Sequence, residues 1–173
     1  MAIVLPDHLR DHPQLRMTHR PNAAAIIRNS KDQLLWCERI TAPGVWQFPQ
    51  GGVDEGETVE QAMWREVSEE LGVDEPWRFM TIEDRLAAPL CYDFPIPVIE
   101  RFLALQGDSY IGQGQHFFSL RWRGDDRLIT LAPPEGEHRE FAQFVWGDTG
   151  YLAHTAPFKT DVIRRALSAF GLL

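Results

Sequence analysis

One stretch of the chain, Gly51–Val73, constrains what this sequence can fold into more than any other. It reads GGVDEGETVEQAMWREVSEELGV, and glycines cluster with acidic residues at its start, which is typical of a turn. Thr58 and Gln61 form a capping box, which predicts the first turn of a helix. Gly72 is a residue of the kind that ends helices. The stretch is therefore predicted to be a loop followed by a helix that ends near Leu71.

The predicted helix has two different sides. Apolar side chains recur every four residues and form a stripe that can pack against a core. At about 100° per residue, Glu66, Glu69 and Glu70 fall within an arc of roughly 100° beside that stripe. Like charges at these spacings repel, each pair costing about a few tenths of a kcal/mol, so the arrangement suggests a bound cation. Carboxylate oxygens suit hard ions such as Mg²⁺ or Mn²⁺. The alternative, from these residues alone, is a solvated helix face.

The whole stretch resembles the Nudix box, a motif of widely spaced Gly, Glu and Arg-Glu-apolar-x-Glu-Glu-x-Gly-apolar positions. The matching residues are Gly51, Glu57, Arg65, Glu66, Val67, Glu69, Glu70, Gly72 and Val73. The resemblance implies an α/β Nudix fold, in which a mixed β-sheet is sandwiched between helices. It also implies divalent-metal-dependent hydrolysis of a pyrophosphate bond in a nucleotide derivative. The family pattern further implies an ion pair between Glu57 and Arg65 that braces the loop.

Composition limits the remaining possibilities. The 173 residues are interpreted as an N-terminal extension, residues 1–18, and one domain, residues 19–173. The net charge of −8 argues against sequence-independent coating of nucleic acid, so no DNA partner is expected. Two cysteines fit a reducing compartment, and no segment has the length of a membrane span or the core of a signal peptide. We therefore expect a cytoplasmic protein without a membrane partner, as a monomer or a homodimer.

Periodicity and turn residues predict the other elements of the domain. A hairpin is expected from strands at 23–28 and 33–39, with a short strand at 46–48 leading into the box. Further strands are predicted at 101–105, 115–123 and 141–146, with an edge strand at 128–131 and a loop at 133–137. Apolar residues at helical spacing predict a last helix at 159–170.

Residues outside the box narrow the resemblance to one branch of the family. WQFPQGG, followed by DEGE, is similar to the bacterial RNA 5′-pyrophosphohydrolases and the asymmetrical diadenosine tetraphosphate hydrolases. HRPNAAAII, YIGQGQHFFSL, Glu140-Phe141 followed by Trp146, and FKTDVIRRAL resemble further segments of that branch and cover roughly residues 19–170. Two departures weaken the expected preference for RNA. His116 stands where the branch usually has Lys, and residues 86–98 are poor in basic side chains.

The resemblance implies a metal site with more than one Mg²⁺ or Mn²⁺ ion. Glu66 and Glu70, with the carbonyl group of Gly51, are expected to hold ions that bridge the phosphates of the substrate. Glu69 and Glu140 are expected to complete the metal shell, and one of the two to orient or deprotonate water. The sequence leaves open which of them is the base. Taken alone, a Glu in a loop is usually solvated.

Residues in four other segments are candidates for binding the substrate. Each has an ordinary alternative, surface charge for the cations and core packing for the aromatic rings. Charge-assisted hydrogen bonds to phosphate and stacking on a base would use such side chains. The candidates are Arg20, Arg39 and Lys159 for phosphate, and Tyr92 and Phe158 for the base.

Three functions are compatible with these residues. The first is an RNA 5′-pyrophosphohydrolase that converts a 5′-triphosphate end to a monophosphate. The second is an asymmetrical diadenosine tetraphosphate hydrolase, which gives ATP and AMP. The third, a Nudix module that senses a nucleotide without cleaving it, is disfavoured because every carboxylate of the box is present.

Overall fold

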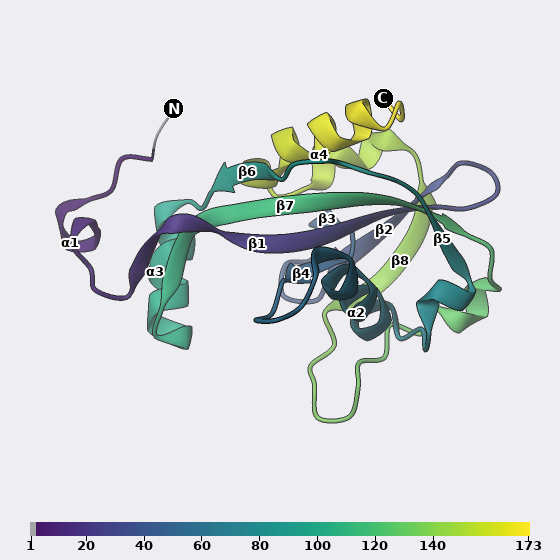
Figure 1. Cartoon of the computed structure of the whole chain (residues 1–173), viewed down its shortest axis with the longest axis horizontal. Coiled ribbons are helices and arrows are strands. Elements are labelled where there is room, and N and C mark those ends of the chain that lie inside the picture. Colours follow the sequence, from purple (N-terminus) through teal and green to yellow (C-terminus); the bar gives the residue numbers. More distant parts are fainter. Residues whose placement is uncertain (1–2) are drawn as a thin grey trace.

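A computed structural model describes residues 3–173 of the chain as a mixed eight-stranded sheet between helices (Figure 1). The sheet order is β3-β2-β1-β7-β5, and β4, β6 and β8 pair with β1, β7 and β2 respectively. The strands are β1 (Leu15–Arg28), β2 (Leu34–Arg39), β3 (Trp46–Gln47), β4 (Gln50–Gly52), β5 (Met80–Arg85), β6 (Leu90–Asp93), β7 (Ser109–Trp122) and β8 (Phe141–Gly147). The α-helices are α1 (Asp7–Arg10), α2 (Val59–Leu71), α3 (Ile96–Gln106) and α4 (Pro157–Ala169). Short 3₁₀ turns occupy Pro76–Arg78, Asp126–Leu128 and Thr149–His154. The predicted fold class is confirmed.

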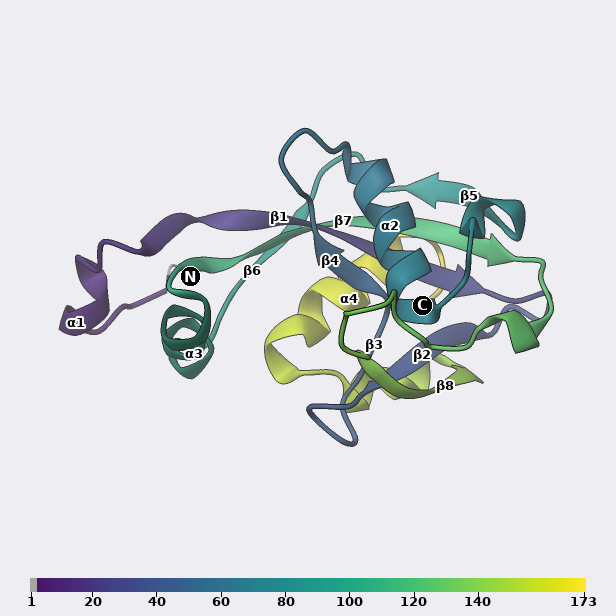
Figure 2. The same ribbon diagram turned by 90° about the horizontal axis from the view of Figure 1, so that it is seen from below.

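The parallel pair β1 and β7 forms the centre of the sheet, and helices cover both of its faces. Ala23, Ala25 and Ile27 of β1 are buried with the apolar stripe of α2, whereas Ala24 and Ile26 are buried with that of α4. Both faces of this strand are therefore apolar, as expected for a strand covered on two sides. Figures 1 and 2 show α2 and α4 on opposite sides of these strands.

The loop and helix of the box form as predicted. The amide of Gln61 donates to the Thr58 hydroxyl oxygen (3.1 Å), and the Thr58 amide donates to the Gln61 side-chain oxygen (2.8 Å). This reciprocal capping box satisfies two amides that have no partner within the helix. Helix α2 ends at Leu71, and Gly72 takes a left-handed conformation with φ of 65°. The predicted hairpin, the strand at 141–146 and the last helix are also present, with shifted boundaries.

The strand predicted at 101–105 is wrong, because these residues lie in helix α3. Pro97 lies in the first turn of the helix, where its missing N–H costs little. Gly107 follows the last turn with φ of 82° and donates its amide to the carbonyl of Leu103. Ile99, Phe102 and Leu103 have helical spacing and pack into one cluster, so the correct period was present in the sequence.

The predicted edge strand at 128–131 is also wrong. A 3₁₀ turn ends at Leu128, and the amides of Thr130 and Leu131 both donate to the carbonyl of Leu71. These amides therefore bond to the end of helix α2 instead of a neighbouring strand. The helix gains partners for a carbonyl group that its own backbone leaves free.

The boundary expected between an extension and a domain at residue 18 falls inside a strand. Strand β1 begins at Leu15, well before the predicted start at 23, and pairs with β7 from there onward. Leu5, Leu9 and Leu15 are buried in the same cluster as Ile99 of α3. Helices α1 and α3 accordingly lie together at one end of the molecule (Figure 1). Strands β5 and β6 were not predicted, and none of the helices in 3–173 is long and apolar enough to span a membrane.

Candidate active site

Arg65 holds the loop of the box against helix α2. Its guanidinium donates to both carboxylate oxygens of Glu57 (2.8 and 3.0 Å) and to the carbonyl of Gly52 (2.8 Å). Glu57 also accepts from the amide of Asp54 (3.0 Å). The hydrogen bonds from Arg65 lower the pKa of Glu57 below its ordinary value and raise the pKa of Arg65. The ion pair expected between these two residues is therefore present, and it ties the helix to the loop at two points.

Glu66 lies directly beside the backbone of the loop. A Cβ atom at Gly51 would overlap with the Glu66 carboxylate, so a larger residue here would displace the Glu66 side chain from its present position. Arg65 donates to the same carboxylate (2.7 Å). Burial nevertheless raises the pKa of Glu66, because desolvation outweighs the hydrogen bond. The carboxylate and the Gly51 backbone thus border one small region of space.

Glu70 is the most buried carboxylate of the box. Its side chain accepts a hydrogen bond from the amide of Gln50 (2.9 Å), and the residue is only 8% exposed. Burial and the neighbouring charges of Glu66 and Glu140 raise its pKa well above the ordinary value, and Lys159 opposes this shift. Such a carboxylate is costly to ionise without a nearby cation.

A cavity of about 550 Å³ lies in front of these carboxylates. It brings together the acidic and basic residues that were predicted from distant segments of the sequence. Strands β1, β2 and β4 and helices α2 and α4 contribute to its walls. The predicted residues that line it are Gly51, Glu66, Glu70, Glu140, Arg20, Arg39, Phe158 and Lys159.

Glu69 and Tyr92 lie outside the lining of this cavity. The Glu69 carboxylate accepts from Arg65 (3.3 Å), and burial raises its pKa. Tyr92 is a core residue that is 7% exposed, and burial raises the pKa of its hydroxyl. Its hydroxyl donates to the side chain of Gln113, and its ring centre lies 5.9 Å from that of Phe158. Tyr92 therefore supports two cavity residues from behind.

The structure adds cavity residues that the sequence analysis missed. Arg101 and Phe102 come from α3, whose helical spacing was the overlooked signal. Asn22 and Gln113 come from β1 and β7, and predicting their place at the cavity would have required knowledge of how the two strands pair. Asn22 is fully buried, and its side-chain nitrogen has no hydrogen-bond partner among residues 3–173. It is a buried, unpaired donor at the wall of the cavity, which is uncommon in folded proteins.

Lys159 faces the carboxylates from helix α4. It is 9% exposed, and burial together with the charge of Arg39 lowers its pKa to about 8, whereas Glu70 and Glu140 act in the opposite direction. A lysine with this pKa is largely protonated at neutral pH and loses its charge in mildly alkaline solution. Its position suits contact with a phosphate group rather than an ion pair with one fixed carboxylate.

The oxygen atoms at the cavity are of the kind that binds a hard divalent cation, although the carboxylates do not point toward a single common position. Among residues 3–173, no group of three or more His, Cys, Asp and Glu side chains is arranged to hold a metal ion. Arg65 instead holds the carboxylates of Glu66 and Glu69. The ligand atoms at the cavity wall are all oxygens, which is the set that Mg²⁺ and Mn²⁺ prefer. Glu70, buried with one amide hydrogen bond, is the carboxylate that gains most from such an ion.

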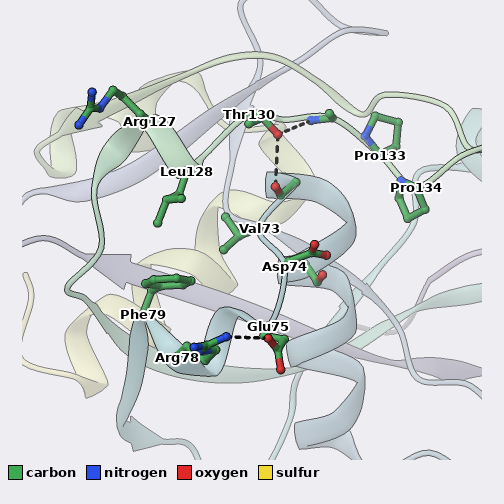
Figure 3. A pocket seen from close by; sticks show the side chains of 13 residues that line it. Val73, Asp74, Glu75, Arg78, Phe79, Arg127, Leu128, Thr130, Pro133 and Pro134 are labelled. Atoms are coloured by element: carbon green, nitrogen blue, oxygen red, sulfur yellow. Dashed lines mark hydrogen bonds and ion pairs between the residues drawn. The ribbon is translucent and has the colours of Figure 1, made fainter.

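A larger cavity of about 680 Å³ lies elsewhere, beyond the C-terminal end of α2 (Figure 3). Its walls come mainly from the loop after α2 and from residues around Thr130 and Pro133. Ser68 is its only contribution from within α2, and no carboxylate of the box lines it. Volume alone would point to this cavity, but the predicted catalytic groups lie at the smaller one.

Comparison with known proteins agrees with the geometry of the box. The sequence matches the NUDIX domain over residues 18–164. The chain belongs to the Nudix family. An RNA pyrophosphohydrolase of Sphingopyxis alaskensis is 34% identical, and the alignment covers 94% of this chain and 98% of that protein. Nudix hydrolase 26 (chloroplastic) of Arabidopsis thaliana is 34% identical over 88% of this chain and 69% of its own length.

Solved structures of Nudix proteins share the fold. The E. coli dihydroneopterin triphosphate pyrophosphohydrolase has a TM-score of 0.64 at 21% identity and covers 90% of this chain and 97% of that one. A C. elegans Ap4A hydrolase has a TM-score of 0.55 at 19% identity, covering 87% and 96%. Family membership and the RNA pyrophosphohydrolase relatives together make this Nudix protein an enzyme that hydrolyses pyrophosphate bonds. Nudix hydrolases act on nucleotide polyphosphates and generally need divalent metal ions.

Proposed function

We propose that this Nudix hydrolase is an RNA 5′-pyrophosphohydrolase, which converts 5′-triphosphate ends of RNA to 5′-monophosphates. The observation that carries the proposal is the cavity, where Arg20, Arg39 and Lys159 face the carboxylates Glu66 and Glu70. A polyphosphate needs this combination of cations for its oxygens and oxygen ligands for its metal ions. Relatives that are RNA pyrophosphohydrolases, 34% identical over nearly the whole chain, support the choice of substrate.

The cavity contains several positively charged side chains, although residues 86–98 have few basic ones. Helix α3 begins at the end of that segment, at Ile96, and brings Arg101 to the cavity wall, where Arg20, Arg39 and Lys159 also lie. The lack of basic side chains in residues 86–98 is therefore offset by an arginine that lies outside that segment. This restores support for an RNA end as the substrate.

In this proposal Glu66, Glu70 and the carbonyl of Gly51 hold Mg²⁺ or Mn²⁺, with more than one ion present. When bound, the ions neutralise the polyphosphate and lower the pKa of the attacking water. Arg20, Arg39 and Lys159 bind and orient the phosphate groups, since in-line displacement at phosphorus depends mainly on positioning and electrostatics. Phe158 stacks on the terminal base, and Tyr92 supports Phe158 from the core.

Two carboxylates remain candidates for orienting the attacking water. Glu140 lines the cavity and is exposed, so its carboxylate is free to move toward a substrate. Glu69 is held by Arg65 at 3.3 Å and reaches the cavity only after a change in that contact. The geometry therefore favours Glu140 for the water, and Glu69 for completing the metal shell.

The second candidate is asymmetrical cleavage of diadenosine tetraphosphate to ATP and AMP. His116, where the branch usually has Lys, is the observation that favours it, because burial lowers the pKa of this residue and it carries little positive charge for an RNA backbone. The same cavity would hold the tetraphosphate chain.

One experiment separates the two candidates. A 5′-triphosphorylated RNA and diadenosine tetraphosphate are each incubated with the enzyme and Mg²⁺, and pyrophosphate or phosphate release is compared with ATP production. Faster turnover of the RNA is expected, and Glu70→Gln should lower the rate of both reactions by about a hundredfold or more. Turnover of diadenosine tetraphosphate alone would replace the first function by the second.

We also propose a cytoplasmic location, because Cys37 and Cys91 are both free thiols. Recognition of one RNA end requires only one cavity, so both a monomer and a homodimer are compatible with the proposed reaction.

A further inference from the structure

Helix α3 carries two side chains of the active-site cavity, but little within the helix itself fixes its position. Arg101 and Phe102 line the cavity that also contains Glu66 and Glu70. The helix has 11 residues, a length at which isolated helices are marginal in water. In the part of the chain that the structure describes, no side chain caps its first turn, and Ile99 is its only buried residue. Contacts with neighbouring segments must therefore hold Arg101 and Phe102 in place.

The N-terminal segment buries apolar side chains together with this helix. Leu5, Leu9 and Leu15 belong to the same buried cluster as Ile99. Figures 1 and 2 both show the short helix α1 near α3 at one end of the molecule. The first residues of a domain are usually poorly ordered unless other contacts tie them down. The buried leucines indicate that this segment is docked as a part of the domain.

Polar contacts join the N-terminal segment to α3 at two points. In the middle of the helix, the carboxylate of Glu100 lies 2.8 Å from Nε2 of His8, which belongs to α1. Beyond the end of the helix, the amide of Ser109 donates to the carbonyl of Gln14 (3.1 Å). Ser109 is only two residues after Gly107, where the helix ends. The segment is therefore attached to α3 itself and to the chain that leaves it.

We propose that residues 5–14, which we call the N-terminal brace, hold α3 in position and thereby place Arg101 and Phe102 at the active-site cavity. Leu9 is then a positioning residue for substrate binding. None of residues 5–14 lines that cavity, so the brace acts through the helix. Arg101 and Phe102 follow Ile99 by less than one helical turn, so a shift of the helix at Ile99 moves both of them. Small displacements of groups that position a substrate are costly.

The kinetic test compares Leu9→Ala with Met80→Ala in the full chain. Both side chains are 2% exposed, but Met80 lies on β5 in the other core cluster, with the apolar stripe of α2. The two truncations are of similar size and should destabilise the protein to a similar degree.

The brace predicts that KM and kcat respond differently. Leu9→Ala should raise KM by about five- to tenfold, the effect of one or two weakened contacts to a charged substrate, with kcat within about twofold. Met80→Ala should leave both constants within about twofold at a temperature where both variants are folded. Leu9→Met keeps an apolar side chain of similar volume and should restore the wild-type KM. An equal rise in KM from Leu9→Ala and Met80→Ala would overturn the inference.

A double-mutant cycle tests whether the effect passes through α3. In a background that carries Arg101→Gln and Phe102→Leu, the groups that the brace positions are already altered. Leu9→Ala should then change KM by less than about twofold, because coupled substitutions are not additive. A rise in KM that is as large in this background as in the wild type would reject transmission through Arg101 and Phe102.

Hydrogen exchange tests the brace without catalysis. Leu9→Ala should speed exchange of the α3 amides about tenfold, while the α2 amides keep their protection, because local opening of one element does not expose another. Leu5→Ala is a second variant at the same docking surface and should have the same effect. Unchanged exchange in α3 for both variants, or equal acceleration in α2, would overturn the inference.

The inference depends on the place of Arg101 and Phe102 at the cavity and not on which polyphosphate is cleaved. The kinetic constants are therefore measured with 5′-triphosphorylated RNA and with diadenosine tetraphosphate. Absence of turnover with the RNA would reject the RNA function alone. The brace would then be judged from the kinetics with diadenosine tetraphosphate and from hydrogen exchange.

Discussion

Replacing Glu70 by Gln should stabilise this enzyme in the absence of metal while it removes activity. The Glu70 carboxylate is 8% exposed, accepts one hydrogen bond from the Gln50 amide and lies near the charges of Glu66 and Glu140. A glutamine of the same shape keeps an oxygen for the Gln50 amide and removes the buried charge. Incompletely paired buried charges are destabilising, and active sites commonly store such a cost.

The expected gain in the free energy of unfolding is about 1–2 kcal/mol. For a domain of this size, about 1 kcal/mol shifts Tm by roughly 2–4 °C, so Glu70→Gln should melt about 2–8 °C above the wild type in EDTA. Mg²⁺ should reverse the order, because an ion that binds only the folded wild type stabilises it by mass action. Turnover should fall about a hundredfold or more, in line with loss of a catalytic group.

Scanning calorimetry at pH 7.5 measures Tm for the variant and the wild type, first in EDTA and then in Mg²⁺. Glu60→Gln is the control, because Glu60 lies on the same helix with an exposed side chain and its loss changes the net charge equally. The control should change Tm by no more than about 2 °C in either buffer. A lower Tm for Glu70→Gln in EDTA, or equal stabilisation of this variant and the wild type by Mg²⁺, would refute the reasoning.

Three further predictions concern the cap, the phosphate contact and the attacking water. Thr58→Ala removes the side-chain oxygen that accepts from the Gln61 amide, and should lower the free energy of unfolding by about 1 kcal/mol in urea titrations, with Thr58→Ser as the conservative control. Binding of ADP in EDTA should weaken as pH rises from 7 to 9, because Lys159 loses its proton near a pKa of about 8. Lys159→Arg should make the affinity for ADP nearly independent of pH in this range. An unchanged pH dependence in that variant would argue against a contact between Lys159 and the phosphates. Glu140→Gln should lower kcat by about a hundredfold with KM nearly unchanged if it orients water. Glu69→Gln should instead raise the Mg²⁺ concentration needed for half-maximal rate, and the opposite pattern would exchange the two roles.

Local signals in the sequence were sufficient for the box and insufficient for the cavity beside it. The start of α2 follows from Thr58 and its end from Gly72, because caps act within one turn of a helix. The segment RFLAL, beginning at Arg101, is short and apolar, so its length alone does not separate strand from helix. Pro97 lies in the first turn of helix α3 and Gly107 follows its last turn. These two residues therefore indicate a helix rather than the strand predicted at 101–105.

A smaller cavity of about 250 Å³ adjoins the active-site cavity and is lined by Arg16, Arg20 and Tyr110 among others. It could not be predicted in this way, because it depends on long-range pairing. Arg20 lies opposite Gln113, and Arg16 opposite Tyr110, only because β1 and β7 are parallel in one particular register. A shift of one residue would move these side chains to the other face of the sheet. The residues at 15–18 were assigned to an extension, so the part of β1 that carries Arg16 was missing from the predicted domain.

The distribution of charge around the box explains why a divalent ion is expected at Glu70 in particular. Arg65 donates to Glu57, Glu66 and Glu69, so these three carboxylates already have a cationic partner. Within residues 3–173 Glu70 has only the Gln50 amide as a hydrogen-bond donor, and Lys159 acts on it without a direct hydrogen bond. The free energy gained from an added cation is greatest where a buried charge is least compensated. The same helix face therefore has a permanent cation on the loop side and a place for an exchangeable one on the cavity side, where the polyphosphate would lie.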